Sequence, residues 1–191
     1  MKRREFGKVK YIHSRKGITQ IQLVIIAVVV VVLVAAGVYY YMSMQMEAPT
    51  ATEQANMALA QGMWDAVSRG DISSLPGKVW ATDFKRYLSP TAAPLDTAGQ
   101  VQRLNGLHAT FSDFDLSVVE MVAHGDRVAG LLMFTGKQTG AFMGIPPTGK
   151  SVKIRFLEEV RIVNGKVVEQ WGAPDYMDLL QQIGAKISAG P

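Results

Sequence analysis

Apolar residues are distributed unevenly along this chain of 191 residues. The segment 18–41 contains no charged side chain, and residues 21–38 within it are almost wholly aliphatic. An apolar run longer than about 18 residues is typical of a helix that crosses a membrane. The pattern therefore predicts one transmembrane helix over residues 18–41, followed by a region in which polar and apolar residues are mixed.

Two segments after the apolar run carry apolar residues at helical spacing, and both are predicted to be helices. The first covers residues 51–71. The second covers residues 96–111, where Thr97 and Gln100 have the spacing of a capping box. Between them, residues 71–80 are expected to form a short helical turn followed by irregular chain.

After the second helix the apolar residues change from helical spacing to alternation, which indicates strands. Two strands are predicted within residues 114–138, a third over 150–163 and a fourth over 166–171, with a type I′ turn at Asn164–Gly165. A closing helix is predicted over residues 174–187. This order defines an α+β fold with a four-stranded antiparallel meander. Such a curved sheet can pack on helices as a cone with an apolar pocket at its open end.

Charge gives the predicted transmembrane helix an orientation. Residues 1–17 hold seven of the 20 basic side chains and one of the 16 acidic ones, so 13 basic and 15 acidic side chains remain beyond them. The positive-inside rule places this basic N-terminus in the cytoplasm. The nearly neutral remainder argues against nucleic acid as a partner. We expect a single-pass protein of the cell membrane, with a linker over 42–52 and an extracytoplasmic domain over 53–191.

The N-terminal segment allows more than one interpretation. The stretch SRKGITQIQLVIIAVVVVV resembles a class III (prepilin-type) signal, in which a peptidase cleaves after the glycine, here Gly17, and the apolar helix stays on the mature protein. Gln22 stands where many bacterial pilins have Glu. An uncleaved single-span anchor is the simpler alternative, and the small residues at 34–37 leave signal-peptide cleavage open.

The composition excludes several kinds of functional site. The chain has no cysteine, which excludes disulfides, thiolate chemistry and cysteine-based metal sites. Its histidines, His13, His108 and His124, do not have the spacing of a metal motif. No serine triad, phosphate-binding loop or dinucleotide fingerprint is present in the sequence.

The connection between the second and third predicted strands is unusual, because residues 140–156 read GAFMGIPPTGKSVKIRF. The Pro–Pro pair cannot donate hydrogen bonds to a sheet ladder, so this segment must contain a long hairpin connection. Phe142, Met143 and Ile145 make the turn apolar, although turns are usually polar.

This hairpin and the sequence around it carry a resemblance to a known family. The matching stretches are HGDRV, TGKQTG, FMGIPPTG, NGKVVEQW and PDYMDLLQQ, and with the helices the similarity covers residues 53–186. The region resembles the SnoaL-like polyketide (ester) cyclases, of the nuclear transport factor two-like superfamily of α+β cones. The resemblance implies that the hairpin folds over one side of the cone and covers core or pocket. A rigid loop packed on the sheet edge is the alternative.

Cyclases of this family close a ring by intramolecular aldol condensation, and the resemblance implies no metal and no cofactor. Such chemistry needs a general base, and a donor for the developing enolate oxygen, in a dry pocket. Asp175, four residues after Trp171, matches the family's candidate acid/base aspartate. It is also placed to cap the last helix, and capping by backbone donors lowers a carboxyl pKa and weakens the base.

His108 is the second catalytic candidate, either as a proton donor in the pocket or as a core histidine with one satisfied nitrogen. Family members often have His where this chain has Gln138 and Gln170. Many also carry a smaller or neutral polar residue in place of Arg161. An arginine facing the pocket would hold Asp175 ionised or bind an anionic ligand, and one on the outer face would do neither. The expected pocket residues are Trp64, Phe134, Gln138, Phe142, Phe156, Arg161 and Trp171.

Two functions remain open from the sequence. One is a membrane-anchored cyclase or isomerase that acts on a small apolar carbonyl compound, with Asp175 as the base. The other is a non-catalytic module of the same fold that holds a small apolar molecule or mediates an interaction. A homodimer through the sheet is expected by analogy with other cones of this type.

Overall fold

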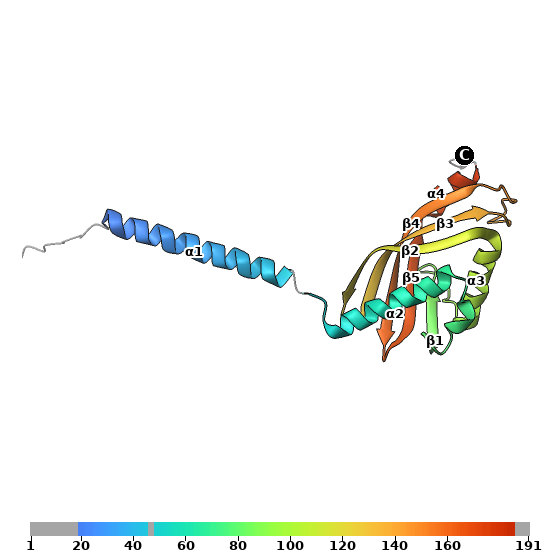
Figure 1. Cartoon of the computed structure of the whole chain (residues 1–191), viewed down its shortest axis with the longest axis horizontal. Coiled ribbons are helices and arrows are strands. Elements are labelled where there is room, and N and C mark those ends of the chain that lie inside the picture. The colour runs from blue at the N-terminus through green and yellow to red at the C-terminus, as the bar shows by residue number, and fades with distance from the viewer. Residues whose placement is uncertain (1–18, 46–47, 186–191) are drawn as a thin grey trace, which may run out of the picture. The chain divides into compact units, whose positions relative to one another are not determined.

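The computed structural model describes residues 19–45 and 48–185. It divides into two compact units, Met1–Ala48 and Pro49–Pro191. The described part of the first unit is helix α1 (Gln20–Gln45), and the second unit contains the sheet and the other helices (Figure 1).

Helix α1 has 26 residues, and its segment Gln20–Ser43 has a mean hydropathy of 3.1. At 1.5 Å per residue such a helix exceeds the roughly 30 Å hydrocarbon thickness of a bilayer. Length and composition thus permit a membrane span, and a signal sequence near the N-terminus would meet the same criteria. The helix continues beyond the predicted end at Tyr41. The predictions for Gly17 and for the basic residues 1–17 lie outside the described residues.

Within residues 48–185 the strands form a five-stranded sheet in the order β1-β5-β4-β3-β2. Their bounds are Trp80–Tyr87 (β1), Phe111–His124 (β2), Arg127–Gln138 (β3), Ser151–Val163 (β4) and Lys166–Pro174 (β5). Strands β2 to β5 form the predicted antiparallel meander. The φ angles of Asn164 and Gly165 are 51° and 68°, as a type I′ turn requires. The α+β class is confirmed.

Strand β1 is an element that the sequence pattern does not predict. It begins at Trp80, the last residue of the segment expected to be irregular, and pairs in parallel with β5, where Lys85 lies opposite Glu169. Its residues do not alternate cleanly between apolar and polar. Because its partner is parallel and far along the chain, no short hairpin turn in the sequence marks the pairing. The expected sheet of four antiparallel strands is therefore incomplete, and the sheet is mixed.

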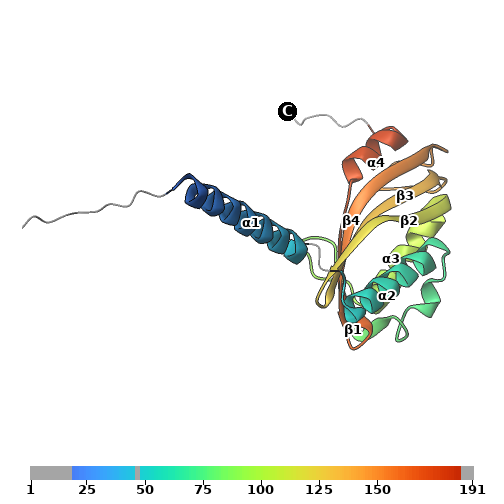
Figure 2. The ribbon, with the colours of Figure 1, turned by 60° about the vertical axis from the view of Figure 1, so that its left-hand side comes forward.

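The helices of the second unit lie around this sheet (Figure 2). Helices α2 (Ala51–Ser68) and α3 (Thr97–Thr110) cover one of its faces, and α4 (Tyr176–Ile183) packs against β4. A short 3-10 helix, η1 (Ile72–Ser74), leads from α2 toward β1.

A capping box begins α2. The Thr50 hydroxyl accepts the Glu53 N–H at 3.2 Å, and the Glu53 carboxylate accepts the Thr50 N–H at 2.8 Å. The Gly125 N–H also donates to this carboxylate at 2.8 Å, which ties the start of α2 to the β2–β3 turn. The N–H groups of Thr50 and Gly125 together lower the pKa of Glu53.

Helix α3 begins with a different cap from the one predicted. The Asp96 side chain accepts the Gly99 N–H at 2.8 Å, so the expected capping box of Thr97 and Gln100 is wrong. Asp is a stronger N-cap than Thr, and the residue before the predicted cap takes that role. Gln100 is thereby free to turn its side chain inward, where it is 1% exposed.

The hydrophobic core fills most of the space between the helices and the sheet. Its largest members, each less than 2% exposed, include Met63, Trp64, Trp80, Phe84, Phe111 and Leu132. The core does not extend without interruption to the end at which α4 lies, because a cavity remains there.

Candidate functional site

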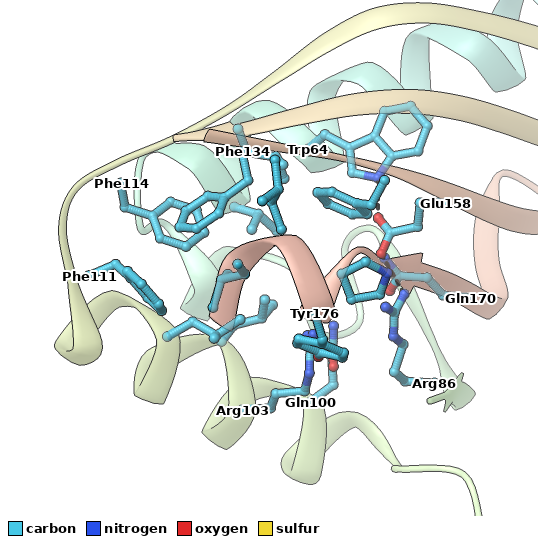
Figure 3. A pocket seen from close by; sticks show the side chains of 18 of the residues that line it. Trp64, Arg86, Gln100, Arg103, Phe111, Phe114, Phe134, Glu158, Gln170 and Tyr176 are labelled. Atoms are coloured by element: carbon cyan, nitrogen blue, oxygen red, sulfur yellow. Dashed lines mark hydrogen bonds and ion pairs between the residues drawn. The ribbon is translucent and has the colours of Figure 1, made fainter. Parts of the chain in front are cut away.

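The cavity lies between α3, α4 and the helix-covered face of the sheet (Figure 3). Its volume is about 80 Å³. One water molecule needs about 10–15 Å³ of such space, so the cavity has room for roughly six atoms of that size. The interior of the cone is therefore not filled by its own side chains.

Seven aromatic side chains line the cavity, and we call them the aromatic wall. They are Trp64, Phe111, Phe114, Phe134, Phe142, Phe156 and Tyr176. The Phe111 ring packs edge-on against the rings of Phe134 and Phe142, with centroid distances of 5.3 Å in both pairs. The predicted pocket residues Trp64, Phe134, Phe142 and Phe156 all lie in this wall.

The long hairpin between β3 and β4 is held in place by Gln138, which is fully buried. Its side-chain nitrogen donates to the carbonyl oxygens of Gly140 and Pro146 at 3.1 and 3.2 Å, and its oxygen accepts the Thr148 hydroxyl at 2.6 Å. These bonds fix the turn so that Phe142 covers the cavity. Gln138 thus supports the hairpin and does not line the cavity itself.

Polar residues gather at one end of the cavity. The polar side chains in the lining are Arg86, Gln100, Arg103, Glu158 and Gln170. Glu158, on β4, accepts the Trp64 indole N–H at 2.6 Å with Oε2 and the Arg86 guanidinium at 2.5 Å with Oε1. The ion pair is buried, with Arg86 1% and Glu158 7% exposed. Both carboxylate oxygens are thus engaged by donors from other elements.

Glycines on the neighbouring strands make room for this arrangement. Glu158 lies opposite Gly130 on β3 and opposite Gly172 on β5, so the three residues form one row across the sheet. A Cβ at Gly130 would lie 2.7 Å from the ring of Trp64, and a Cβ at Gly172 would lie 2.5 Å from Nη2 of Arg86. Any larger residue at either position would displace a side chain that holds Glu158.

Three buried polar atoms near this end have no hydrogen-bond partner in the part of the chain that the structure describes. They are Nε of Arg86, Oε1 of Gln100 and Oε1 of Gln170. The two glutamines are 1% and 3% exposed. Buried polar groups in proteins are nearly always paired, so these side chains make the polar end the least satisfied part of the domain interior.

Asp175 is the N-cap of α4, where its carboxylate accepts the Asp178 N–H at 2.9 Å. The side chain is exposed and is not part of the cavity lining, whereas its neighbours Pro174 and Tyr176 are. The structure therefore gives Asp175 the capping role. Its role as a general base stays a prediction.

Two other predicted residues lie away from the cavity lining. Nε2 of His108 is 2.8 Å from the carbonyl oxygen of Val67, and its ring stacks on Phe114 at 4.0 Å, so it packs behind the aromatic wall. Trp171 stacks on Tyr87 with a centroid distance of 5.1 Å and borders a separate hollow of the sheet.

Arg161 is also outside the cavity lining. Its Nε donates to the Glu169 carboxylate at 2.6 Å, and Nη1 lies 3.8 Å from the carboxylate of Asp126. The bond with Glu169 raises the pKa of Arg161 and holds the pKa of Glu169 below its usual value. Arg161 therefore lies on the outer face, which is the second of the two alternatives, and it contributes no charge to the cavity.

Sequence reasoning missed most of the polar end. Arg86 lies on the unpredicted strand β1, and Gln100 was assigned to a cap. A signal for Glu158 was present, because it occupies the inward phase of β4 together with Ile154 and Val160. A charged residue at a position of a strand that otherwise carries inward-facing apolar residues indicates either a buried ion pair or a functional site.

Among residues 19–45 and 48–185, no group of three His, Asp or Glu side chains is placed to hold a metal ion. The polar end of the cavity can instead donate and accept hydrogen bonds, since Arg86 offers an N–H and the glutamine amides offer both kinds of group.

Comparison with known proteins identifies related sequences. The model of the SnoaL-like polyketide cyclase family matches residues 58–183. Nogalonic acid methyl ester cyclase of Streptomyces nogalater is 31% identical over 84 residues, which cover 44% of this chain and 63% of that enzyme. Aklanonic acid methyl ester cyclase DnrD of Streptomyces peucetius is 29% identical over 77 residues, which cover 40% and 53%. The matches thus span less than two thirds of either enzyme.

Solved structures resemble the second unit over nearly their whole length. AclR, a candidate hydroxylase from Streptomyces galilaeus, is 34% identical with a TM-score of 0.63, and the match covers 69% of this chain and 97% of AclR. IdmH, a candidate polyketide cyclase from Streptomyces antibioticus, is 28% identical with a TM-score of 0.62, and the match covers 68% and 99%.

Proposed function

Because the chain belongs to the SnoaL-like polyketide cyclase family, we propose that its C-terminal domain holds a small, mostly apolar molecule inside the cone. One observation carries this proposal: a cavity of about 80 Å³ remains between the helices and the sheet, and its lining combines apolar side chains with buried polar ones at one end. A bound molecule could place a polar group at that end while its apolar part contacts the phenylalanine rings.

We propose that α1 anchors this domain to the cell membrane as a single span, with the domain on the extracytoplasmic side. The apolar segment Gln20–Ser43 supports an anchor, and the basic residues 1–17 before it favour a cytoplasmic N-terminus. Protease added to intact cells should then digest the domain. Digestion only in inverted membrane vesicles would refute this orientation.

Catalysis is the second candidate function, as a cofactor-free cyclase or isomerase acting on a small carbonyl compound. Two observations favour it: the chain matches proteins named as cyclases, and Asp175 stands between two residues of the cavity lining. However, Asp175 would have to leave the Asp178 N–H and enter the cavity to act as a base. Glu158 is already bonded through both oxygens. Holding a molecule requires no such rearrangement, so we place binding first.

Asp175→Asn separates these two functions. Asn caps helices about as well as Asp, so the variant keeps the start of α4 while removing the carboxylate. In the full chain in detergent micelles, we expect small cyclic ketones to raise the melting temperature of the variant and of the wild type equally. Turnover by the wild type that disappears in the variant would establish catalysis. If no apolar oxygenated compound shifts the melting temperature of the wild type, the binding proposal fails.

We also propose that the domain self-associates through the outer face of the sheet. A hollow of about 630 Å³ there is lined by Tyr87, Trp171 and Leu157, and Leu157 is 61% exposed. Leu157→Lys should reduce the molar mass measured by light scattering in detergent. Val163→Lys is the matched control, because Val163 is also on β4 but does not line this hollow. A wild-type chain that is monomeric would overturn the proposal.

A further inference from the structure

The cavity lining carries more positive than negative charge. It contains two arginines and one acidic residue, which are Arg86, Arg103 and Glu158. Arg86 and Glu158 lie 2.5 Å apart in a buried ion pair, so their charges match each other. Arg103 has no ion pair with any residue in the part of the chain that the structure describes. One positive charge of the lining is therefore left without a counter-charge.

The position of Arg103 on α3 places its side chain at the cavity. The residues of this helix that line the cavity have the spacing i, i+3, i+4 and i+7, which puts them on one helix face; they are Gln100, Arg103, Leu104 and Leu107. Figure 3 shows Arg103 reaching from α3 toward Tyr176 on α4. Tyr176 is 39% exposed and Arg103 is partly exposed, so this part of the lining is open to an entering molecule.

Arg103 differs from the other arginines of residues 48–185. Arg86 and Arg161 are also shielded from solvent, and each is paired with a carboxylate. Arg69 and Arg155 have no ion pair, but they are exposed and water solvates them. Among the arginines that the structure describes, only Arg103 is partly shielded and also without a carboxylate partner. It is thus the arginine whose charge a bound anion would match best.

We infer that the molecule held in the cone carries a single carboxylate, which pairs with Arg103 while an apolar ring contacts the aromatic wall; the inference rests on the proposed function. A guanidinium has only donors, and its planar fork matches the two oxygens of a carboxylate. A neutral amide or ester accepts from the same N–H groups but leaves the positive charge unmatched. A dianion would bring a second negative charge that the lining does not match.

The rest of the cavity sets the size of the apolar part. Phe111, Phe134 and Phe156 supply flat apolar surfaces, and a volume of about 80 Å³ suits one ring better than a fused system. An aromatic monocarboxylate therefore fits both the wall and the charge.

Three single-ring probes separate the alternatives. They are 4-fluorobenzoate, 4-fluorobenzamide and 4-fluorotoluene, titrated against the full chain in micelles of a non-ionic detergent and followed by ¹⁹F NMR. Each dissociation constant is corrected for partition of the probe into protein-free micelles. We expect the benzoate to bind about tenfold more tightly than the amide, near the lower end for a charge-assisted hydrogen bond, because Arg103 is partly exposed.

Variants test whether Arg103 is responsible for the preference. Arg103→Gln should weaken binding of the benzoate by about tenfold, leave binding of the amide and the toluene unchanged, and keep the melting temperature of the empty protein. Arg103→Lys should keep most of the preference, because an ammonium supplies the charge without the fork. Arg69→Gln is the matched control, since Arg69 is exposed at the end of α2 and does not line the cavity.

Salt gives a test that needs no variant. Added NaCl should weaken binding of the benzoate to the wild type and leave binding of the amide unchanged, because a partly exposed ion pair is screened. This measurement serves if Arg103→Gln does not fold.

The outcomes distinguish this inference from the proposed function. If none of the three probes binds, the cone is not a binding site and both proposals fall. Carboxylate recognition alone is overturned, while binding stands, if the amide or the toluene binds the wild type as tightly as the benzoate. It is equally overturned if Arg103→Gln binds the benzoate as the wild type does, or if NaCl leaves the preference unchanged.

Discussion

Gly172 offers the sharpest test of how the polar end is built. A Cβ at this position would lie 2.5 Å from Nη2 of Arg86 and 3.0 Å from Oε1 of Glu158. Gly172 is paired with Glu158 on β4, and the preceding Trp171 is also paired with Tyr87 on β1, so we expect the guanidinium rather than the backbone to move. Gly172→Ala should therefore break the buried ion pair. Breaking such a pair destabilises a protein by about 3–5 kcal/mol.

The expected loss corresponds to a fall of roughly 10–20 °C in melting temperature for a domain of this size. The three tryptophans all lie in this domain, so their fluorescence during heating of the full chain in detergent reports its unfolding. Gly106→Ala is the matched control. No described atom lies within 4 Å of a Cβ at Gly106, which is on α3, so Ala should stabilise by about 0.5–1 kcal/mol. A Gly172→Ala variant that melts with the wild type would refute this account of the ion pair.

Three further changes have definite expected results. In a double-mutant cycle measured by thermal melting, Arg86→Met and Glu158→Leu should each destabilise by about 3–5 kcal/mol, and together cost far less because no buried charge is left alone. Asp175→Ala should cost about 1 kcal/mol through loss of the cap, whereas Asp175→Asn should cost little. The hydrogen bond from Arg161 lowers the pKa of Glu169 in the folded protein. The contribution of Glu169 to stability is therefore complete above the pKa that its carboxyl has in the unfolded chain, and it is lost as the pH falls through the lower pKa of the folded protein. Glu169→Gln should therefore flatten the acid limb of the melting-temperature profile, and an unchanged limb would contradict the assignment.

Much of the fold was predictable because local signals specify it. The alternation over β2 to β5 and the Asn164–Gly165 turn lie within one continuous stretch, so each strand is placed next to its neighbour by a short connection. The aromatic wall was predictable for the same reason, since Phe134 and Phe156 occupy the inward phase of strands already placed. Strand β1 was not predictable in this way, because its partner β5 lies at the other end of the domain.

The polar end was harder to predict because it depends on contacts between distant elements. Sequence alternation allows at most one of Glu158 and Glu159 to face inward, and the sheet shows that it is Glu158, with Glu159 paired to Arg127 outside. Arg86 needs β1 to be placed first. The same limit affected Asp175, for which cap and base are both consistent with the sequence and only the surroundings of the side chain distinguish them.

The row of Gly130, Glu158 and Gly172 connects stability with binding. Trp64 and Arg86 fill the spaces above the two glycines and hold the carboxylate rigidly, so the groups around the cavity are in place before a ligand arrives. Such preorganisation reduces the ordering that binding requires. It also has a cost, because a buried ion pair and unpaired polar atoms are less stable than an apolar core of the same shape. A molecule that binds only the folded domain offsets this cost by mass action. This balance supports the proposal that the polar end takes part in holding a molecule.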